Sequence, residues 1–242
     1  MAQFPNQAAQ ILEIDATHGV TFRIMVPEDV PAVTKAMAAA FYAGEPTTQA
    51  GACTIRDWNS FTAMFTPRMA EQGLTVVAID DTKGVVLGAF LCEDYSTPDP
   101  PSFGSFVEAA EGDWMPTLAC IDALEAHFNL AYGVPKEGAA RPAGRWFHLW
   151  MLGVVPGGRG KGIARKLALH SLAVAKQKGF AVAFAECTGA VSTHIMTEHC
   201  GASVEMFVDY STFDGCDTAA AVLRRLPALG HKGMSLTVNK LA

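Results

Sequence analysis

The strongest structural signal in this chain is the segment Val154-Val155-Pro156-Gly157-Gly158-Arg159-Gly160-Lys161-Gly162-Ile163-Ala164. An apolar run ends there, a proline stops strand pairing, and small residues lead into a pattern typical of a helix. Because Gly160, Gly162 and Ala164 have little or no side chain, the backbone N–H groups of the first helical turn stay accessible. Such a turn can bind a diphosphate, and Arg159 and Lys161 add positive charge beside it.

Two other phosphate-binding motifs do not fit this segment. A Walker A loop requires Ser or Thr directly after Gly-Lys, whereas Gly162 follows Lys161. A dinucleotide-binding fingerprint requires a third glycine where Arg165 stands, and it lies in an early βαβ unit. An ordinary glycine-rich turn between a strand and a helix is the structural alternative.

Hydrophobic periodicity predicts the elements around this turn, and their order favours one mixed α/β domain. We expect strands at residues 20–26, 74–79, 85–92, 146–155, 180–186, 204–210 and 234–240, and helices at residues 28–42, 55–71, 114–132, 160–178 and 191–199. The polar, proline-containing stretch 95–113 is predicted to be a long loop. Residues 1–19 are weakly patterned and are expected to form a loose arm or an edge element.

Length, composition and charge exclude several classes of protein. A chain of 242 residues can form one or two domains, and 50% hydrophobic against 17% charged residues excludes a disordered polypeptide. The net charge of −6 argues against binding to nucleic acid or to anionic membranes. The six cysteines form no Cys-x-x-Cys pair, and from the sequence pattern we expect neither a signal peptide nor a membrane-spanning helix. These features predict a cytoplasmic protein with neither nucleic acid nor membrane as partner.

The pattern Arg159-x-x-Gly162-x-Ala164, behind Leu152-x-Val154-x-Pro156, resembles the pyrophosphate-binding signature of the GNAT superfamily of acyl-CoA-dependent N-acyltransferases. The segments 41–46 (Phe-Tyr-Ala-Gly-Glu-Pro) and 187–192 (Cys-Thr-Gly-Ala-Val-Ser) are similar to segments of insect arylalkylamine (dopamine) N-acetyltransferases. The resemblance covers about residues 20–240 and implies a mixed, largely antiparallel, twisted central sheet flanked by helices. It implies a single N-acetyltransferase domain over residues 20–242, preceded by an arm at residues 1–19.

The resemblance also implies acetyl-CoA as the co-substrate and names the residues that bind it. Backbone N–H groups around residues 152–154 would bind the acetyl carbonyl and the pantetheine amides. The full set of implied acetyl-CoA contacts is Leu152, Val154, Val155, Arg159, Gly160, Lys161, Gly162, Ile163 and Ala164.

Transfer of an acetyl group to an amine requires a base, because an alkylamine has a pKa of about 10 and is protonated at neutral pH. His148 is the first candidate: alternation along the predicted strand places residues 148, 150 and 152 on one face, so His148 and Trp150 would line one cleft. Residues 148–154 resemble a strand of vertebrate serotonin N-acetyltransferases, which have histidines at both the 148 and 150 positions. The alternative is a hydrogen-bonded core histidine.

Glu45 is the second candidate base, because the matching glutamate of the insect enzymes is implied to take this role; a solvated helix end is the alternative. Residues 191–200 contain no tyrosine that could protonate the departing thiolate. Ser192 matches a serine of the insect pattern and is the candidate acid, although a polar residue at a helix start is the alternative. Phe41, Tyr42 and Trp150 are expected to contact the amine, with core packing as the alternative for such aromatic side chains.

Together these features predict an enzyme that transfers the acetyl group of acetyl-CoA to a small primary amine by direct attack in a ternary complex. An arylalkylamine is the favoured acceptor, and a polyamine or another small amine is the nearest alternative. A different class is an acyl-CoA-binding sensor without turnover. No metal is expected, since the spacing of His194 and His199 does not match His-Glu-x-x-His. The chain is expected to be a monomer or a homodimer.

Overall fold

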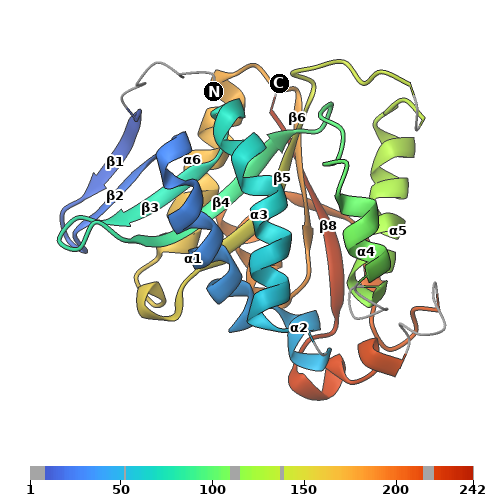
Figure 1. Cartoon of the computed structure of the whole chain (residues 1–242). Coiled ribbons are helices and arrows are strands. Elements are labelled where there is room, and N and C mark those ends of the chain that lie inside the picture. The colour runs from blue at the N-terminus through green and yellow to red at the C-terminus, as the bar shows by residue number, and fades with distance from the viewer. Residues whose placement is uncertain (1–8, 52, 110–114, 137–138, 215–220, 242) are drawn as a thin grey trace.

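The fold is centred on an eight-stranded sheet with the strand order β1-β2-β3-β4-β5-β6-β8-β7 (Figure 1). A computed structural model of the chain describes residues 9–51, 53–109, 115–136, 139–214 and 221–241. All neighbouring strands are antiparallel except β5 and β6, which are parallel. The mixed, largely antiparallel sheet expected from the sequence is therefore confirmed. The strands are β1 (Ile11–Asp15), β2 (Val20–Ile24), β3 (Val76–Asp80), β4 (Val86–Asp94), β5 (Trp146–Val154), β6 (Val182–Cys187), β7 (Ser203–Asp209) and β8 (Gly233–Lys240).

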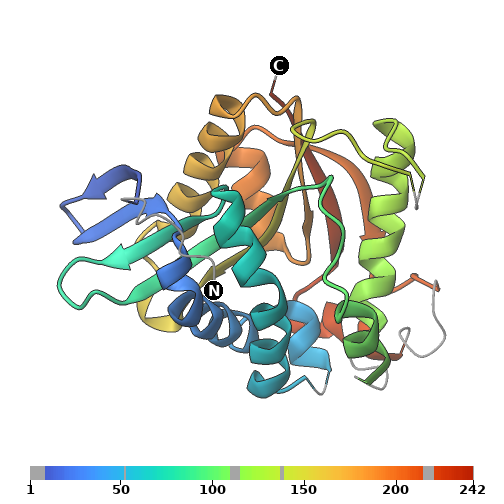
Figure 2. The same ribbon diagram turned by 45° about the horizontal axis from the view of Figure 1, so that its top comes forward.

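Helices cover the sheet on both faces (Figures 1 and 2). Helices α1 (Val30–Tyr42) and α3 (Ile55–Gln72) pack against each other on one face, and α6 (Ile163–Gln177) packs across β3, β4 and β5 on the other. Helix α5 (Met115–Ala131) packs beside β7 and β8. The short helices are α2 (Pro46–Ala50), α4 (Phe103–Ala109) and α7 (Ala190–His194). No helix in the described part of the chain is long and apolar enough to cross a membrane.

The apolar periodicity of the helices explains why each of them is held on its face of the sheet. Ile163 and Leu167 of α6 are at most 2% exposed and belong to a cluster with the sheet residue Phe90. On the opposite face, Met37 of α1 and Phe65 of α3 are at most 1% exposed. At about 1.5–3 kcal/mol for each fully buried large side chain, these two layers fix the helices that flank the site.

Local signals set the ends of α3. Thr54 and Asp57 form a reciprocal capping box at its start, and Gly73 ends it with a φ of +63°. The predicted helix over residues 55–71 is therefore confirmed.

Residues 11–15, within the segment expected to be a loose arm or an edge element, form the edge strand β1, which pairs with β2. Lys166 of α6 donates hydrogen bonds to Glu13 and Asp15 of this strand. Three other segments differ from the sequence-based expectation. The predicted loop 95–113 contains α4, and the stretch after Glu45 forms α2. The predicted helix 191–199 divides into α7 and a π-helical turn, Ile195–His199, which accommodates one extra residue. Trp114, the expected start of α5, and Cys216 lie outside the described residues.

Candidate active site

The sheet opens between β5 and β6. These parallel strands pair only over residues 146–148 and 182–184. Beyond those residues, toward their carboxyl ends, they take no further part in that ladder and diverge. Because the carboxyl ends of adjacent parallel strands are a common place for a ligand, this divergence marks the candidate site.

A β-bulge at Trp150 shapes this part of β5. Leu91 pairs with Met151 and Cys92 pairs with Leu149, so Trp150 is the extra residue. Trp150 and Met151 both pack in the cluster under α1 and α3, whereas Leu152 packs in the cluster under α6. The expectation that residues 148, 150 and 152 share one face is wrong for Leu152, because the bulge interrupts the alternation of side chains.

One cavity, of about 820 Å³, lies beside the carboxyl end of β5 and the start of α6. Val155 and Lys161, which we expected to contact acetyl-CoA, do not line it. The other seven expected contacts do: Leu152, Val154, Arg159, Gly160, Gly162, Ile163 and Ala164.

Gly162 supplies the backbone conformation that opens the first turn of α6. Its φ is +72°, a left-handed conformation that favours glycine. A Cβ atom at Gly162 or Gly160 would have no heavy atom within 4 Å, so the space above the turn is open. The turn therefore has room for an anion at the positive end of the helix.

A second cavity, of about 530 Å³, has an aromatic wall and an acidic lining. The ring centroids of Trp150 and Phe65 are 4.2 Å apart, and Phe61 stacks on Trp150 at 5.3 Å. Tyr42 does not line the cavity and is 49% exposed, so the structure does not place it as we expected. No Lys, Arg or His among the described residues lines this cavity. The lining carboxylates are Glu45, Asp99, Glu108, Asp122, Glu125 and Glu186.

The two cavities meet. The residues that line both are Phe41, Glu45, Leu152, Thr188 and Ser192. The structure thus brings together Phe41, Glu45 and Ser192, which the sequence placed in three separate roles. A ligand in one cavity would be in contact with a ligand in the other at this junction.

Glu45 is buried at the junction and caps α2. It accepts hydrogen bonds from the backbone N–H and the hydroxyl of both Thr47 and Thr48, at 2.6–3.0 Å. Three of these bonds reach Oε2 and only one reaches Oε1. Since a carboxylate oxygen can accept about two hydrogen bonds, Oε1 keeps capacity for a proton or a water molecule.

Ser192 lies near the start of α7, where its hydroxyl donates to the carbonyl oxygen of Gly189 at 3.0 Å. Cys187 also lines the acidic cavity, but burial raises the pKa of its thiol to about 11. The thiol is therefore protonated at neutral pH and a poor nucleophile.

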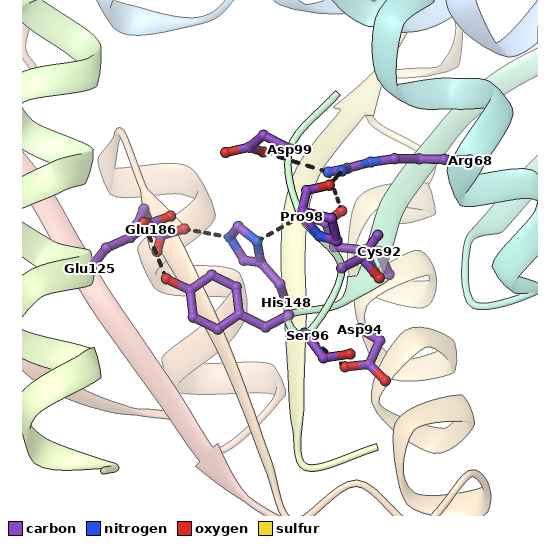
Figure 3. Close-up of polar contacts among 12 residues, drawn as sticks. Arg68, Cys92, Asp94, Ser96, Pro98, Asp99, Glu125, His148 and Glu186 are labelled. Atoms are coloured by element: carbon purple, nitrogen blue, oxygen red, sulfur yellow. Dashed lines mark hydrogen bonds and ion pairs between the residues drawn. The ribbon is translucent and has the colours of Figure 1, made fainter. Parts of the chain in front are cut away.

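His148 is 2% exposed and lines neither cavity. Its ring points toward Glu186 (Figure 3). Its Nδ1 is 3.3 Å from Glu93 Oε1 and its Nε2 is 2.9 Å from Glu186 Oε2. Burial alone would lower the pKa of His148, but the charge and hydrogen bond of Glu186, followed by those of Glu93, raise it to about 10. A histidine protonated at neutral pH cannot accept a proton from the amine, so this geometry argues against the role of base that we predicted.

The residues around His148 form a network that sequence reasoning missed. Arg68 of α3 donates to Glu93 Oε2, and Tyr95 donates to Glu125 at 3.2 Å. Burial, followed by the charge of Glu186, raises the pKa of Glu125 to about 7. The one available signal was a single acidic residue in an otherwise apolar strand, as at Glu186 in residues 180–187.

Glu125, His148 and Glu186 each offer one ligand atom, and these atoms lie within 4.8 Å of one another. This donor set is compatible with a divalent metal ion, and Glu93 on the other ring nitrogen would then orient the imidazole. Without a metal, the same groups form a buried ion pair between the protonated His148 and its carboxylates.

Residues 92–201 match the acetyltransferase (GNAT) family. These residues form a GNAT domain. They include the end of β4, all of β5 and β6, the glycine-rich turn and α6, and they contribute lining residues to both cavities. No curated protein sequence matches the chain significantly.

Several solved structures have a fold similar to that of this chain. Arylalkylamine N-acetyltransferase 2 from Aedes aegypti has a TM-score of 0.71 at 18% identity, with 92% of this chain and 99% of that chain covered. The polyamine N-acetyltransferase of Drosophila melanogaster, which forms N-acetylagmatine, has a TM-score of 0.67 at 19% identity, with 91% and 99% covered. The C-terminal condensation domain of Ebony, in complex with β-alanyl-dopamine, has a TM-score of 0.70 at 15% identity, with 91% and 98% covered.

Proposed function

We propose that the chain transfers the acetyl group of acetyl-CoA to a small primary amine, with an arylalkylamine as the favoured acceptor. The observation that carries this proposal is the meeting of two cavities at Glu45 and Ser192. The open turn before α6 suits the diphosphate of the co-substrate, and the acidic, aromatic cavity suits a cationic amine. Their junction allows the amine to attack the thioester directly in a ternary complex.

Glu45 is the base in this proposal. It lies at the junction, and its less occupied oxygen, Oε1, can take the proton of the amine directly or through one water molecule. Its four hydrogen bonds from Thr47 and Thr48 fix the carboxylate at the junction of the two cavities. His148 has a different part: protonated and buried, it holds Glu186 in place on the cavity wall.

Ser192 and the backbone of β5 complete the proposed machinery. The Ser192 hydroxyl can give a proton to the departing thiolate, because it lines both cavities. Backbone N–H groups near Leu152, beyond the last pair between β5 and β6, would bind the acetyl carbonyl in this proposal. We also keep the proposals that residues 20–242 act as one N-acetyltransferase domain, as a cytoplasmic monomer or homodimer.

The lining supports two classes of acceptor. The rings of Phe41, Phe61, Phe65 and Trp150 favour an arylalkylamine, whose flat ring packs against such a wall. The carboxylates Asp99, Glu125 and Glu186 favour a polyamine or another amine with a second positive charge.

The test is release of free thiol from acetyl-CoA in the presence of 2-phenylethylamine, tyramine, 1,4-diaminobutane or n-butylamine. We expect amine-dependent release with at least one of them. Glu45→Gln should lower kcat by about 100-fold or more, with partial recovery at high pH, where the amine is already neutral. The control Glu71→Gln makes the same change at an exposed carboxylate of α3 and should retain the kcat of the wild type.

Acetyl-CoA binding without thiol release for any amine would favour the sensor without turnover. A Glu45→Gln variant with the kcat and pH profile of the wild type would exclude Glu45 as the base.

A further inference from the structure

Glu186 carries a buried oxygen atom that the protein leaves without a partner. The side chain is 4% exposed, and its Oε2 bonds to His148 Nε2 at 2.9 Å. The other oxygen, Oε1, has no hydrogen-bond partner among the residues that the structure describes. A buried carboxylate oxygen without a donor costs about 1–3 kcal/mol or more, so this atom indicates a missing donor. Glu186 lines the acidic cavity, and a ligand there can supply that donor.

The surroundings of Glu186 select a cationic donor. Glu125 lies beside it, with carboxylate atoms of the two residues within 4.8 Å, and it also lines the cavity (Figure 3). The protonated His148 balances only one negative charge, and Arg68 is paired with Glu93 behind the wall. An ammonium or guanidinium group would satisfy Glu186 Oε1 and would neutralise the second carboxylate.

The position of Glu186 gives the length of the ligand. Glu186 belongs to β6 and lies two residues before Thr188, which lines the junction of the cavities. Two residues of extended chain span about 7 Å. A molecule that places one nitrogen at the junction would therefore need a second polar group about 6–7 Å away to reach Glu186, which is close to the distance of about 6 Å between the two nitrogen atoms of extended 1,4-diaminobutane.

We propose that Glu186 and Glu125 form a subsite for a second cationic group of the acceptor, so that a short diamine binds with one nitrogen at Glu45 and the other at Glu186. This inference rests on the proposed function and, between its two acceptor classes, favours the amine with a second positive charge over the arylalkylamine. The aromatic side chains that line the same cavity, among them Phe61 and Trp150, would cover the carbon chain. Glu186 and Glu125 are specificity-determining residues in this arrangement, and the attack itself remains at the junction.

The test compares 1,4-diaminobutane with n-butylamine, which has the same carbon chain and lacks the second nitrogen. We expect wild-type kcat/KM to favour the diamine by about 10- to 100-fold, as befits a charge-assisted hydrogen bond. Glu186→Gln and Glu125→Gln should each reduce this ratio by about 10-fold or more. Gln can still accept the hydrogen bond of His148 or Tyr95, so the network that holds the wall is kept. The control Glu71→Gln removes an exposed carboxylate of α3 and should leave the ratio unchanged.

Calorimetry of 1,4-diaminobutane with the CoA-loaded protein gives a readout that does not depend on turnover. Weaker binding to Glu186→Gln in a protein that acetylates no amine would support the subsite and reject the proposed function. Acetylation of both amines with an unchanged ratio in folded Glu186→Gln and Glu125→Gln would overturn the subsite and keep the function.

Two further measurements distinguish a diamine from other ligands that could bind at Glu186. Glu186→Gln could instead lower the ratio of tyramine to 2-phenylethylamine and spare the diamine ratio. The partner of Glu186 would then be a phenol hydroxyl, and the cationic subsite would be rejected. Diamine acetylation that disappears after dialysis against EDTA and returns with Zn²⁺ would place a metal ion at Glu125, His148 and Glu186, which would equally overturn the proposal.

Discussion

At His148, two carboxylates hold a proton on a ring that has almost no contact with solvent. The ring stacks on Phe184 with centroids 4.5 Å apart, and Glu93 and Glu186 lie at its two nitrogen atoms. A histidine with its ordinary pKa could act as a base near neutral pH. The two carboxylates raise the pKa of His148, so that its ring is protonated and cannot take this role. The sequence was sufficient to select His148 as a candidate. Its neighbours Glu93 and Glu186 come from β4 and β6, and no local sequence pattern predicts that these strands pair with β5.

The proton on His148 predicts how stability depends on pH. The folded protein holds this proton up to a pKa of about 10, whereas an unfolded histidine loses it near 6.5. The stabilisation is therefore complete below pH 6.5 and is lost as the pH rises toward 10. We expect the free energy of unfolding, measured in urea, to fall between pH 6.5 and 10 in the wild type more than in His148→Gln. Parallel pH profiles for the two proteins would show that the histidine is neutral when folded.

Among the elements, the turn before α6 was the most predictable, because its signal lies within eleven consecutive residues, 154–164. Proline, the small residues and the following apolar stripe all act locally. The bulge at Trp150 was not predictable, because it depends on the register between β4 and β5. Helix α4 was missed because proline, serine and acidic residues dominate residues 95–113, and this composition is typical of loops.

Gly162→Asp tests the anion site of this element. The substitution places a carboxylate at the turn, so CoA affinity should fall by about 100-fold or more through charge repulsion. A left-handed backbone also costs about 1–2 kcal/mol of stability. Gly179→Asp is the matched control: its φ is +83°, and a Cβ there would also have open space, but it lies at the other end of α6. Thermal unfolding should show a smaller destabilisation in Gly162→Asp, whose carboxylate lies at the positive end of α6, than in Gly179→Asp, and calorimetry should show loss of CoA binding only in Gly162→Asp. Equal CoA affinity in the two variants would remove the turn from the cofactor site.

For the whole molecule, the sequence indicated the mixed sheet and the glycine-rich turn but not the acidic lining of the second cavity. The carboxylates come from separate elements: Glu125 from α5, Glu186 from β6 and Glu45 from the start of α2. Their meeting is a product of topology, since the strand order puts β6 next to β5 while α5 packs beside β8 and β7. Charge composition alone showed only an acidic chain.

Two cavities that meet predict sequential kinetics. Both substrates must be present before transfer, because the one thiol on the acidic wall, among the described residues, belongs to Cys187 and remains protonated at neutral pH. Initial rates measured against both substrates should give intersecting lines, and labelled CoA should not exchange into acetyl-CoA without an amine. Parallel lines together with amine-independent exchange would instead demonstrate an acetylated protein.

The divergence of β5 from β6 also affects how rigid the sheet is. Strands β1–β5 and strands β6–β8 are two blocks that share only three residue pairs, close to the amino ends of β5 and β6. The pantetheine arm of acetyl-CoA has amide groups of its own. Bound between the diverging ends of β5 and β6, it would act as a short additional strand and would join the two blocks into one continuous sheet. The co-substrate would then stabilise the sheet as well as react. When CoA leaves after each turnover, the contact between the two blocks would weaken at the place where the next molecule binds.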